Sequence, residues 1–356
     1  MKNKIIFTVF CLSAALCISA AETVNCNGKK SAKMSKDPVY FKHEVKTEKK
    51  PWTHNNFGDR GNGQDFSFAI VADRTGRPRP GVFENAIDKI NKLRPDFVMS
   101  VGDFINGANM ERQDEPFFRE QWKEVHNIVD KCIPPFFYVV GNHDISAPHG
   151  NKQFPGIHER MKKIWESYFG VTDYYFIYKN TLFICMNSMA APGNGFTAKQ
   201  LEWFKDVLKK NKDVRWTFFF FHYPYTWKMD CWEPFEKALY DRNYTVICGD
   251  YHQYTKYVRN GRKYFILGTT GGGENNIGKP LRGVVFGEFD HITWVSMCGD
   301  KPEFLNLALD GLHDEDVVTT NKITWLTAKY FRANKPLSEE EAKKLKAKGI
   351  YIEKEQ

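Results

Sequence analysis

Two short motifs hold the polar side chains best suited to chemistry in this sequence, a Gly-Asp pair at 102–103 and a Gly-Asn-His-Asp run at 141–144. Each directly follows an apolar run of the kind that forms a buried strand. A glycine at a strand exit lets the backbone turn and approach a ligand closely. Because open α/β sheets place their sites at the carboxyl ends of strands, we expect Asp103, Asn142 and His143 to lie together.

Three further apolar runs also end in polar side chains. The runs at 66–72, 216–221 and 245–249 are followed by Asp73, His222 and the tripeptide Asp250-Tyr251-His252. Any one of these residues could be a helix cap, a turn residue or a packed histidine. Together, five strand ends carry oxygen and nitrogen donors without a thiolate, which predicts a hydrolytic metal centre.

The order of these motifs resembles the calcineurin-like metallophosphoesterase superfamily over about residues 64–290. The resemblance implies an α/β fold, a four-layer α/β/β/α sandwich of two mixed β-sheets flanked by helices. It also implies a centre for two divalent metal ions, drawn from Mn, Fe, Zn, Mg and Ca, at the strand ends. The implied activity is hydrolysis of phosphate mono- or diesters by a metal-bridging hydroxide.

The resemblance also assigns roles by position. Asp103 would bridge the two ions, and His143 would sit beside the substrate phosphate as a catalytic residue. Asp144 would orient the ring of His143. The implied metal ligands are, in chain order, Asp73, Asp103, Asn142, His222, Asp250 and His252.

The chain departs from the family pattern at two positions. Thr75 stands where the first motif usually has a histidine, and Asp250 stands where the last motif usually has another. Asp250 can still coordinate as a hard oxygen donor, which favours Mn, Mg or Ca over Zn. Thr75 is a poor substitute, so we expect a weaker first site. These changes leave open a metal- or phosphate-binding protein with little or no activity on the same fold.

Three residues near the motifs are candidates for binding a small phosphate ester. Arg74 and Arg77 follow Asp73 and could bind an anion through paired hydrogen bonds, although such runs are more often solvated loops. Tyr223, in an aromatic cluster after His222, could stack on a base or sugar or simply pack. Monoesters, diesters, nucleotides, sugar phosphates and lipid headgroups all remain open as substrates.

The chain divides into four predicted parts. Residues 1–21 combine early lysines, an apolar stretch and small residues, which predicts a signal peptide and export to the periplasm or the exterior. A Lys-rich leader at 22–60 precedes the catalytic domain at 61–300. Residues 301–356 form an extension, with a charged helix expected at 338–347. No later segment is long and apolar enough to span a membrane.

The basic character of the chain is concentrated in the leader. The formal net charge is +8, and the part after residue 50 is left close to neutral. A nucleic-acid groove would need clustered charge on folded elements, so none is expected. The cysteines show no zinc-binding spacing, and their pairing and the oligomeric state stay open.

Strand and helix patterns alternate through the first part of the predicted domain. Helical spacing occurs at 82–93, 115–129 and 158–169, and a capping box at Thr197 opens another helix. The turn residues at 259–262 predict a hairpin. This alternation predicts an α/β core with later antiparallel strands.

Overall fold

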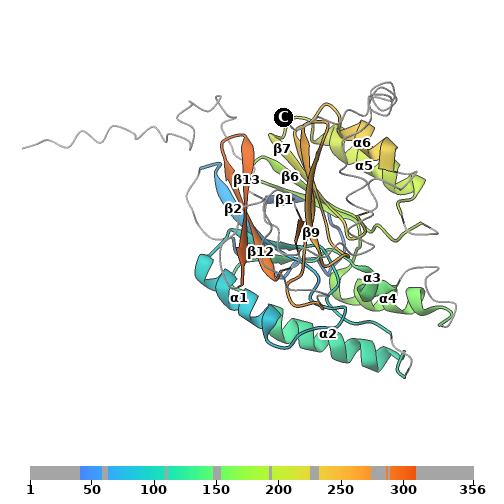
Figure 1. The fold of residues 1–356 in the computed structure, drawn as a ribbon. Coiled ribbons are helices and arrows are strands. Elements are labelled where there is room, and N and C mark those ends of the chain that lie inside the picture. Colours follow the sequence, from blue (N-terminus) through green and yellow to red (C-terminus); the bar gives the residue numbers. More distant parts are fainter. Residues whose placement is uncertain are drawn as a thin grey trace, which may run out of the picture.

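The computed structural model describes two stacked β-sheets with helices on both outer faces (Figure 1). Each sheet contains parallel and antiparallel neighbours, so both are mixed. The described residues are 41–57, 63–108, 111–146, 154–191, 195–224, 232–273, 286–287 and 289–309.

The smaller sheet has five strands in the order β13-β12-β2-β3-β4. Its parallel part is β2, β3 and β4, and β12 and β13 add an antiparallel hairpin beside β2. The bounds are β2 Phe66–Val71, β3 Phe97–Ser100, β4 Phe136–Phe137, β12 His291–Cys298 and β13 Lys301–Ala308.

The larger sheet has eight strands in the order β1-β5-β6-β7-β8-β10-β9-β11. Strands β6, β7, β8 and β10 run parallel, and the outer strands pair antiparallel. The bounds are β1 Phe41–His43, β5 Tyr174–Tyr178, β6 Thr181–Cys185, β7 Trp216–Phe220, β8 Tyr244–Cys248, β9 Tyr254–Arg259, β10 Arg262–Ile266 and β11 Phe286–Gly287.

Helices α1, α2 and α4 cover the outer face of the small sheet, and α5 and α6 cover the large one (Figure 1). The short helix α3 begins inside the Gly-Asn-His-Asp motif. The bounds are α1 Val82–Leu93, α2 Glu115–Val129, α3 Asn142–Ile145, α4 Ile157–Phe169, α5 Ala198–Lys210 and α6 Trp232–Leu239.

Three hydrophobic clusters separate the four layers. Successive side chains of a strand point to opposite faces, so each strand feeds two clusters. In β7, Phe218 and Phe220 enter the cluster between the sheets, whereas Phe219 packs under α5 and α6. In β2, Ile70 faces the other sheet and Val71 faces the helices. The predicted fold of two mixed sheets with flanking helices is confirmed.

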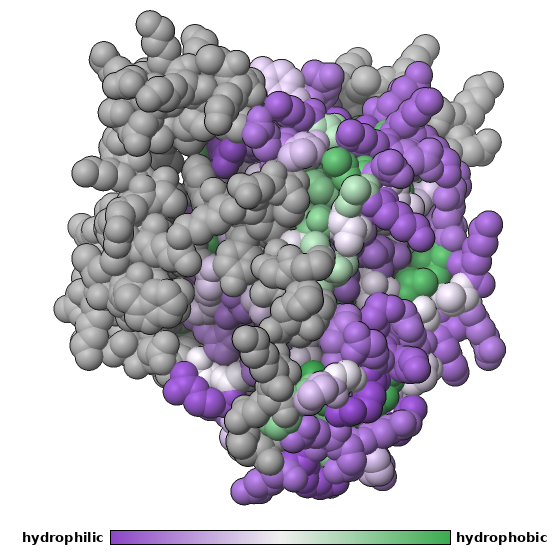
Figure 2. Space-filling model, turned by 90° about the vertical axis from the view of Figure 1, so that its right-hand side faces the viewer, coloured by the Kyte–Doolittle hydropathy of each residue, from purple (hydrophilic) through white to green (hydrophobic). Residues whose placement is uncertain are grey.

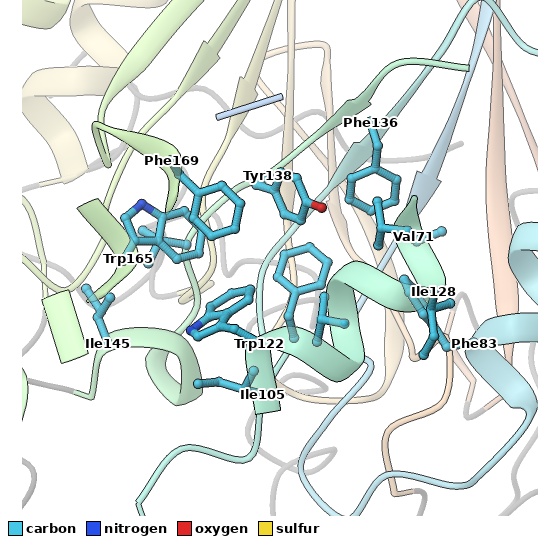
Figure 3. Close-up of a cluster of buried hydrophobic side chains, with 14 of the residues drawn as sticks. Val71, Phe83, Ile105, Trp122, Ile128, Phe136, Tyr138, Ile145, Trp165 and Phe169 are labelled. Carbon is cyan, nitrogen blue, oxygen red and sulfur yellow. The ribbon is translucent and has the colours of Figure 1, made fainter. Parts of the chain in front are cut away.

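The cluster under α2 and α4 supports the chain that carries the Gly-Asn-His-Asp motif (Figure 3). The ring of Phe169 lies 4.4 Å from those of Tyr138 and Trp165, and 5.1 Å from that of Trp122, centroid to centroid. Close aromatic pairs of this kind each contribute about 0.5–1.5 kcal/mol beyond area burial. Tyr138 precedes the motif by three residues, so this packing holds the motif against the sheet edge.

The folded unit is wider than the predicted limits of 61 and 300. Strand β1 pairs with β5, and Trp52 is buried between the sheets, so part of the Lys-rich leader belongs to the fold. Strand β13 completes the small sheet beyond residue 300. Both segments were missed because a three-residue strand and a half-exposed edge strand have weak apolar patterns. The predicted signal peptide and the helix at 338–347 lie outside the described residues.

Most other predicted elements match. The capping box at Thr197 is present, with Gln200 returning the bond to the cap backbone. The strand expected at 136–140 pairs over only two residues, because the chain then leaves the sheet toward α3. Among the described cysteines, Cys132, Cys185 and Cys248 are buried free thiols.

The described surface in Figure 2 is mostly hydrophilic, with apolar side chains confined to small patches. The large apolar residues that are exposed on the described elements are Leu93, Ile133, Tyr240 and Leu305. None of the helices that the structure describes is long and apolar enough to cross a membrane.

Candidate metal centre

The polar residues predicted from the strand ends do meet at one edge of the sandwich. Asp73 and Asp103 follow β2 and β3 of the small sheet, and His222 and Asp250 follow β7 and β8 of the large one. Donor atoms of Asp73, Asp103 and His222 lie within 4.8 Å of one another, and all three residues are buried. Two sheets therefore contribute to one centre.

The backbone of this centre adopts unusual conformations. Four candidate ligands have positive φ, at 36° for Asp73, 61° for Asp103, 76° for Asp250 and 54° for His252. This region is unfavourable for residues other than glycine and persists only where the surrounding structure enforces it. Such strain clusters at functional sites.

Glycines bring the motif loops into contact, as the sequence suggested. A Cβ on Gly102, whose φ is 105°, would lie 2.7 Å from the Cα of Gly141 and 2.9 Å from Nδ1 of His222. A Cβ on Gly141 would lie 2.2 Å from Oδ1 of Asp103. Any side chain at either position would push the ligands apart.

Three histidine side chains near the centre have the same kind of hydrogen-bond partner and the same tautomer. In each ring, Nδ1 faces a backbone carbonyl oxygen. A carbonyl oxygen can only accept a hydrogen bond, so Nδ1 carries the proton and donates the bond. Nε2 is left with its lone pair toward the carboxylates, the arrangement typical of metal-binding histidines. The pairs are His222 with Val101 at 2.8 Å, His252 with Gly273 at 2.6 Å and His143 with Asn106 at 2.9 Å.

Acceptors converge on Nε2 of His222. Oδ1 of Asn142 lies 2.8 Å away, Oδ2 of Asp103 3.3 Å away and Oδ1 of Asp250 3.7 Å away. With Nδ1 committed to Val101, a neutral ring would present a lone pair to these oxygens. The arrangement is stable only with a proton or a cation among them.

The half of the centre around Asp73 lacks one donor. Nε2 of His252 lies 3.7 Å from Oδ1 of Asp73, which accepts the backbone N–H of Asp250 at 3.0 Å. The other carboxylate oxygen of Asp73 is buried without a hydrogen-bond partner. The hydroxyl of Thr75, which stands where the family pattern has a histidine, donates to the side chain of Asn106.

Burial and mutual repulsion shift the pKa values of the cluster. Burial raises the pKa of Asp73 well above its usual range and that of Asp250 to about 7, even though His222 opposes both shifts. Burial would also raise the pKa of Asp103, but the imidazoles of His222 and His143 hold it well below its usual range. Burial lowers the pKa of His222, yet the surrounding carboxylates raise it well above its usual value. The cluster has an excess of negative charge, and its residues fit a divalent cation.

His143 stands on the open side of the centre. Its side chain is 36% exposed, and Nε2 lies 4.0 Å from Oδ2 of Asp103. The prediction that Asp144 orients this ring is wrong, because the carbonyl of Asn106 holds Nδ1. The buried carboxylate of Asp144 instead accepts backbone N–H groups of Gly141, Asp103 and Phe104 at 2.8–3.0 Å. Asp144 thus fastens the two motif loops together.

The predicted role of Arg74 in substrate binding is also wrong. Its guanidinium is buried, donates to the carbonyl of Phe104 at 2.9 Å and pairs with Glu124 of α2. Those contacts hold the loop after β3 to the helix and leave no surface for a substrate. Arg77 lies exposed on the turn after the first motif.

Tyr223 follows the ligand His222 but points into the core. Its side chain belongs to the cluster under α2 and α4, and only 8% of the residue is exposed. Its backbone N–H donates to Oγ of Ser188 at 2.9 Å. Tyr223 therefore supports the strand end and offers no stacking surface to a base or sugar.

The contacts that orient the imidazoles were missed from the sequence. They are made by the backbone carbonyls of Val101, Asn106 and Gly273, and a carbonyl carries no residue-specific signal. One of these carbonyls, that of Gly273, belongs to a glycine-rich stretch at 269–273. A Cβ on Gly272 would lie 2.5 Å from the carbonyl oxygen of Thr75, so this stretch passes directly over the first motif.

Comparison with solved structures places this architecture among known folds. PhoD matches with a TM-score of 0.52 and 9% identity, over 74% of this chain and 73% of its own. A dimetal phosphatase from Danio rerio matches with a TM-score of 0.45 and 15% identity, over 68% of this chain and 99% of its own. GAP50 of Plasmodium matches with a TM-score of 0.47 and 15% identity, over 77% and 95%. Curated protein sequences gave no significant match.

A match to a family model identifies the family of the chain. The model for the calcineurin-like phosphoesterases matches residues 57–254, which contain each of the motifs at the centre. The match spans more than half of the chain and agrees with the sandwich fold and the buried Asp–Asp–His cluster. The chain belongs to the calcineurin-like phosphoesterase family.

Proposed function

We propose that this protein is a metal-dependent phosphoesterase that hydrolyses phosphate mono- or diesters. The observation that carries the proposal is the convergence of Asp73, Asp103 and His222 at the family's motif positions. The buried, unpartnered oxygen of Asp73 supports it further, because a buried carboxylate needs a compensating charge.

The residues divide the work as follows. One ion would be held by Asp73, Asp103 and His252, and a second by the remaining ligands around His222. Bound divalent ions would supply an acidified water and positive charge for the phosphate oxygens. The oxygen-rich donor set favours Mn²⁺, Mg²⁺ or Ca²⁺ over Zn²⁺.

His143 is the group that would move a proton. Its Nδ1–H is committed to the carbonyl of Asn106, so Nε2 is the atom that faces the centre. From the open side of the centre, Nε2 would stabilise or protonate the leaving oxygen. In the metal-free structure, burial lowers the pKa of His143, but the carboxylate of Asp103, whose Oδ2 lies 4.0 Å from Nε2, raises it above its usual value.

The test is a hydrolysis screen with p-nitrophenyl phosphate and bis-p-nitrophenyl phosphate across Mn²⁺, Mg²⁺, Ca²⁺ and Zn²⁺. Metal content is measured in parallel by elemental analysis. Metal-dependent turnover of either ester supports the proposal, and which ester is cleaved separates monoesterase from diesterase.

A second candidate function is metal or phosphate binding without turnover. It is favoured by Thr75, which stands where the family pattern has a metal-binding histidine and whose hydroxyl donates to Asn106. Tight metal binding combined with no hydrolysis of either ester under any metal would select this candidate.

We propose in addition that the protein is exported. The proposal rests on residues 1–21, with their charged start, apolar stretch and small residues before Glu22. Amino-terminal sequencing of material recovered outside the cytoplasm should begin near Glu22. A retained Met1 would refute export through a cleaved signal.

A further inference from the structure

The loop segment Asn106–Gly107 connects the variant residue Thr75 to His143. The carbonyl of Asn106 accepts from Nδ1 of His143 at 2.9 Å, and the side chain of the same asparagine accepts from the hydroxyl of Thr75. Thr75 is completely buried, and its backbone N–H donates to the carbonyl of Asp103 at 3.1 Å. The threonine is therefore fixed at both its backbone and its side chain.

A second anchor comes from α2. Oε1 of Gln121 accepts the backbone N–H of Asn106 at 2.9 Å, and Nε2 of Gln121 donates to the carbonyl of Gly107 at 3.2 Å. The side chain of Gln121 therefore hydrogen-bonds to both peptide groups that flank the carbonyl of Asn106. A Cβ on Gly107 would lie 2.6 Å from the carbonyl oxygen of His143, so the segment also packs tightly on the backbone of its target.

We propose that Thr75 and Gln121 are positioning residues that clamp Asn106 so that its carbonyl fixes the orientation and tautomer of His143. This role rests on the proposed function, and it assigns Thr75 of the first motif a function other than metal binding. Where the family pattern has a metal-binding imidazole, this chain has a hydroxyl that steadies the residue at the leaving oxygen.

The clamp matters because Asn106 itself is exposed at the open side of the centre. An exposed loop carbonyl samples several directions unless side chains hold it, and the ring that it orients would then share its motion. Partners of this kind, one step removed from the reacting atoms, typically cost about 10–100-fold in activity when they are lost.

The central test is Thr75→Val, which keeps the shape of the side chain and removes the hydroxyl. We expect kcat to fall about 10-fold with KM nearly unchanged and metal content intact. Thr75→Ser should restore kcat. A second variant, Gln121→Ala, should lower kcat in the same way, with Lys123→Ala on the same helix as its control.

The chain offers a matched control for the threonine. Thr293 on β12 donates to Oδ1 of Asn306 on β13 at 3.1 Å, a buried Thr–Asn bond at a strand pair outside the centre. Thr293→Val should lower the unfolding temperature by a similar amount and leave kcat unchanged. Equal losses of kcat in Thr75→Val and Thr293→Val would show a merely structural role and overturn the proposal.

A readout independent of turnover is the ¹⁵N–¹H correlation spectrum of the imidazoles in Mg²⁺-loaded protein. Wild type should show His143 as the Nδ1–H tautomer, and Thr75→Val should show a mixture. An unchanged spectrum and unchanged kcat, or loss of bound metal in Thr75→Val, would overturn the clamp. If wild type hydrolyses neither ester, the proposed function fails, while the spectrum still decides whether Thr75 orients the ring.

Discussion

Two buried clusters of charge in this protein behave in opposite ways. In the first, Glu236 of α6 meets Arg259 of β9, with Nη2 donating to Oε2 at 2.8 Å and Nε 2.7 Å from Oε1. The hydroxyl of Tyr264 adds a bond to the same carboxylate at 3.0 Å. In this cluster one carboxylate neutralises one guanidinium, and the ion pair links α6 to the larger sheet.

The charges of the candidate metal centre are not balanced in this way. Asp73, Asp103 and Asp250 gather around His222, an oxygen of Asp73 has no hydrogen-bond partner, and the three aspartates have positive φ. Charge balance and backbone conformation therefore distinguish the two clusters. A cluster that is neutral by itself can stabilise the fold, whereas one with several carboxylates and a strained backbone has the character of a functional site and is suited to bind a cation.

The largest effect is expected from Asp103→Asn. Asp103 lies between both halves of the centre, so its loss should weaken metal affinity by more than about 100-fold and abolish turnover. Titration with Mn²⁺ followed by elemental analysis measures this. The control is Asp96→Asn, a buried carboxylate at the opposite end of β3 that accepts from Ser67 and Tyr178, which should keep its metal. Equal metal binding by the two variants would contradict the assignment.

His143→Ala should come next. Metal content should stay at the wild-type level, and kcat should fall by about 10²–10⁴ because a general acid is removed. His158→Ala is the matched control, since Nδ1 of His158 also contacts a backbone carbonyl, that of Ser146, at 2.7 Å. Steady-state kinetics that show no loss for His143→Ala would place the chemistry elsewhere.

Glu236→Ala tests the other side of the comparison. Removing one partner of a buried ion pair leaves an uncompensated charge and should lower the free energy of unfolding by about 3–5 kcal/mol. Replacing both partners, Glu236→Leu with Arg259→Met, should recover most of that loss. Urea unfolding measures both, and metal stoichiometry should be unchanged in each. A loss of metal in the double variant would mean that the two clusters are coupled.

The smallest effect is a pH dependence of metal affinity. In the metal-free protein, burial raises the pKa of Asp250 to about 7, so below that pH a cation must displace its proton. Apparent affinity should therefore fall as pH drops from 8 to 6, by at most about tenfold per pH unit for each proton released. Calorimetry in buffers of different ionisation enthalpy counts the protons. Asp250→Asn should make the dependence shallower by the one proton that Asp250 releases, and an equal slope in both proteins would contradict it.

The sequence was a good guide wherever chemistry follows from residue type and from a strand end. Asp73, Asp103, Asn142 and His222 each follow an apolar run or a glycine, and all four meet where predicted. It was a poor guide to which groups a polar side chain contacts in the folded protein. Arg74 adjoins the first motif yet turns into the fold to meet Glu124, and Asp144 ends the most specific motif yet binds backbone N–H groups.

The order of most strands and helices, the ligand types and the loss of one imidazole from each half of the centre could be predicted from the amino-acid sequence. These properties follow from local periodicity and from the side chains themselves. The three-dimensional structure was needed to show that β1 and β13 join the sheets, that three carbonyls orient the imidazoles, and that Thr75 donates a hydrogen bond to Asn106. The strand pairings and the carbonyl contacts join distant segments through backbone atoms that every residue shares, so no residue type marks them in advance. The Thr75–Asn106 bond joins two side chains that are 31 residues apart, and local periodicity does not reveal such a pairing.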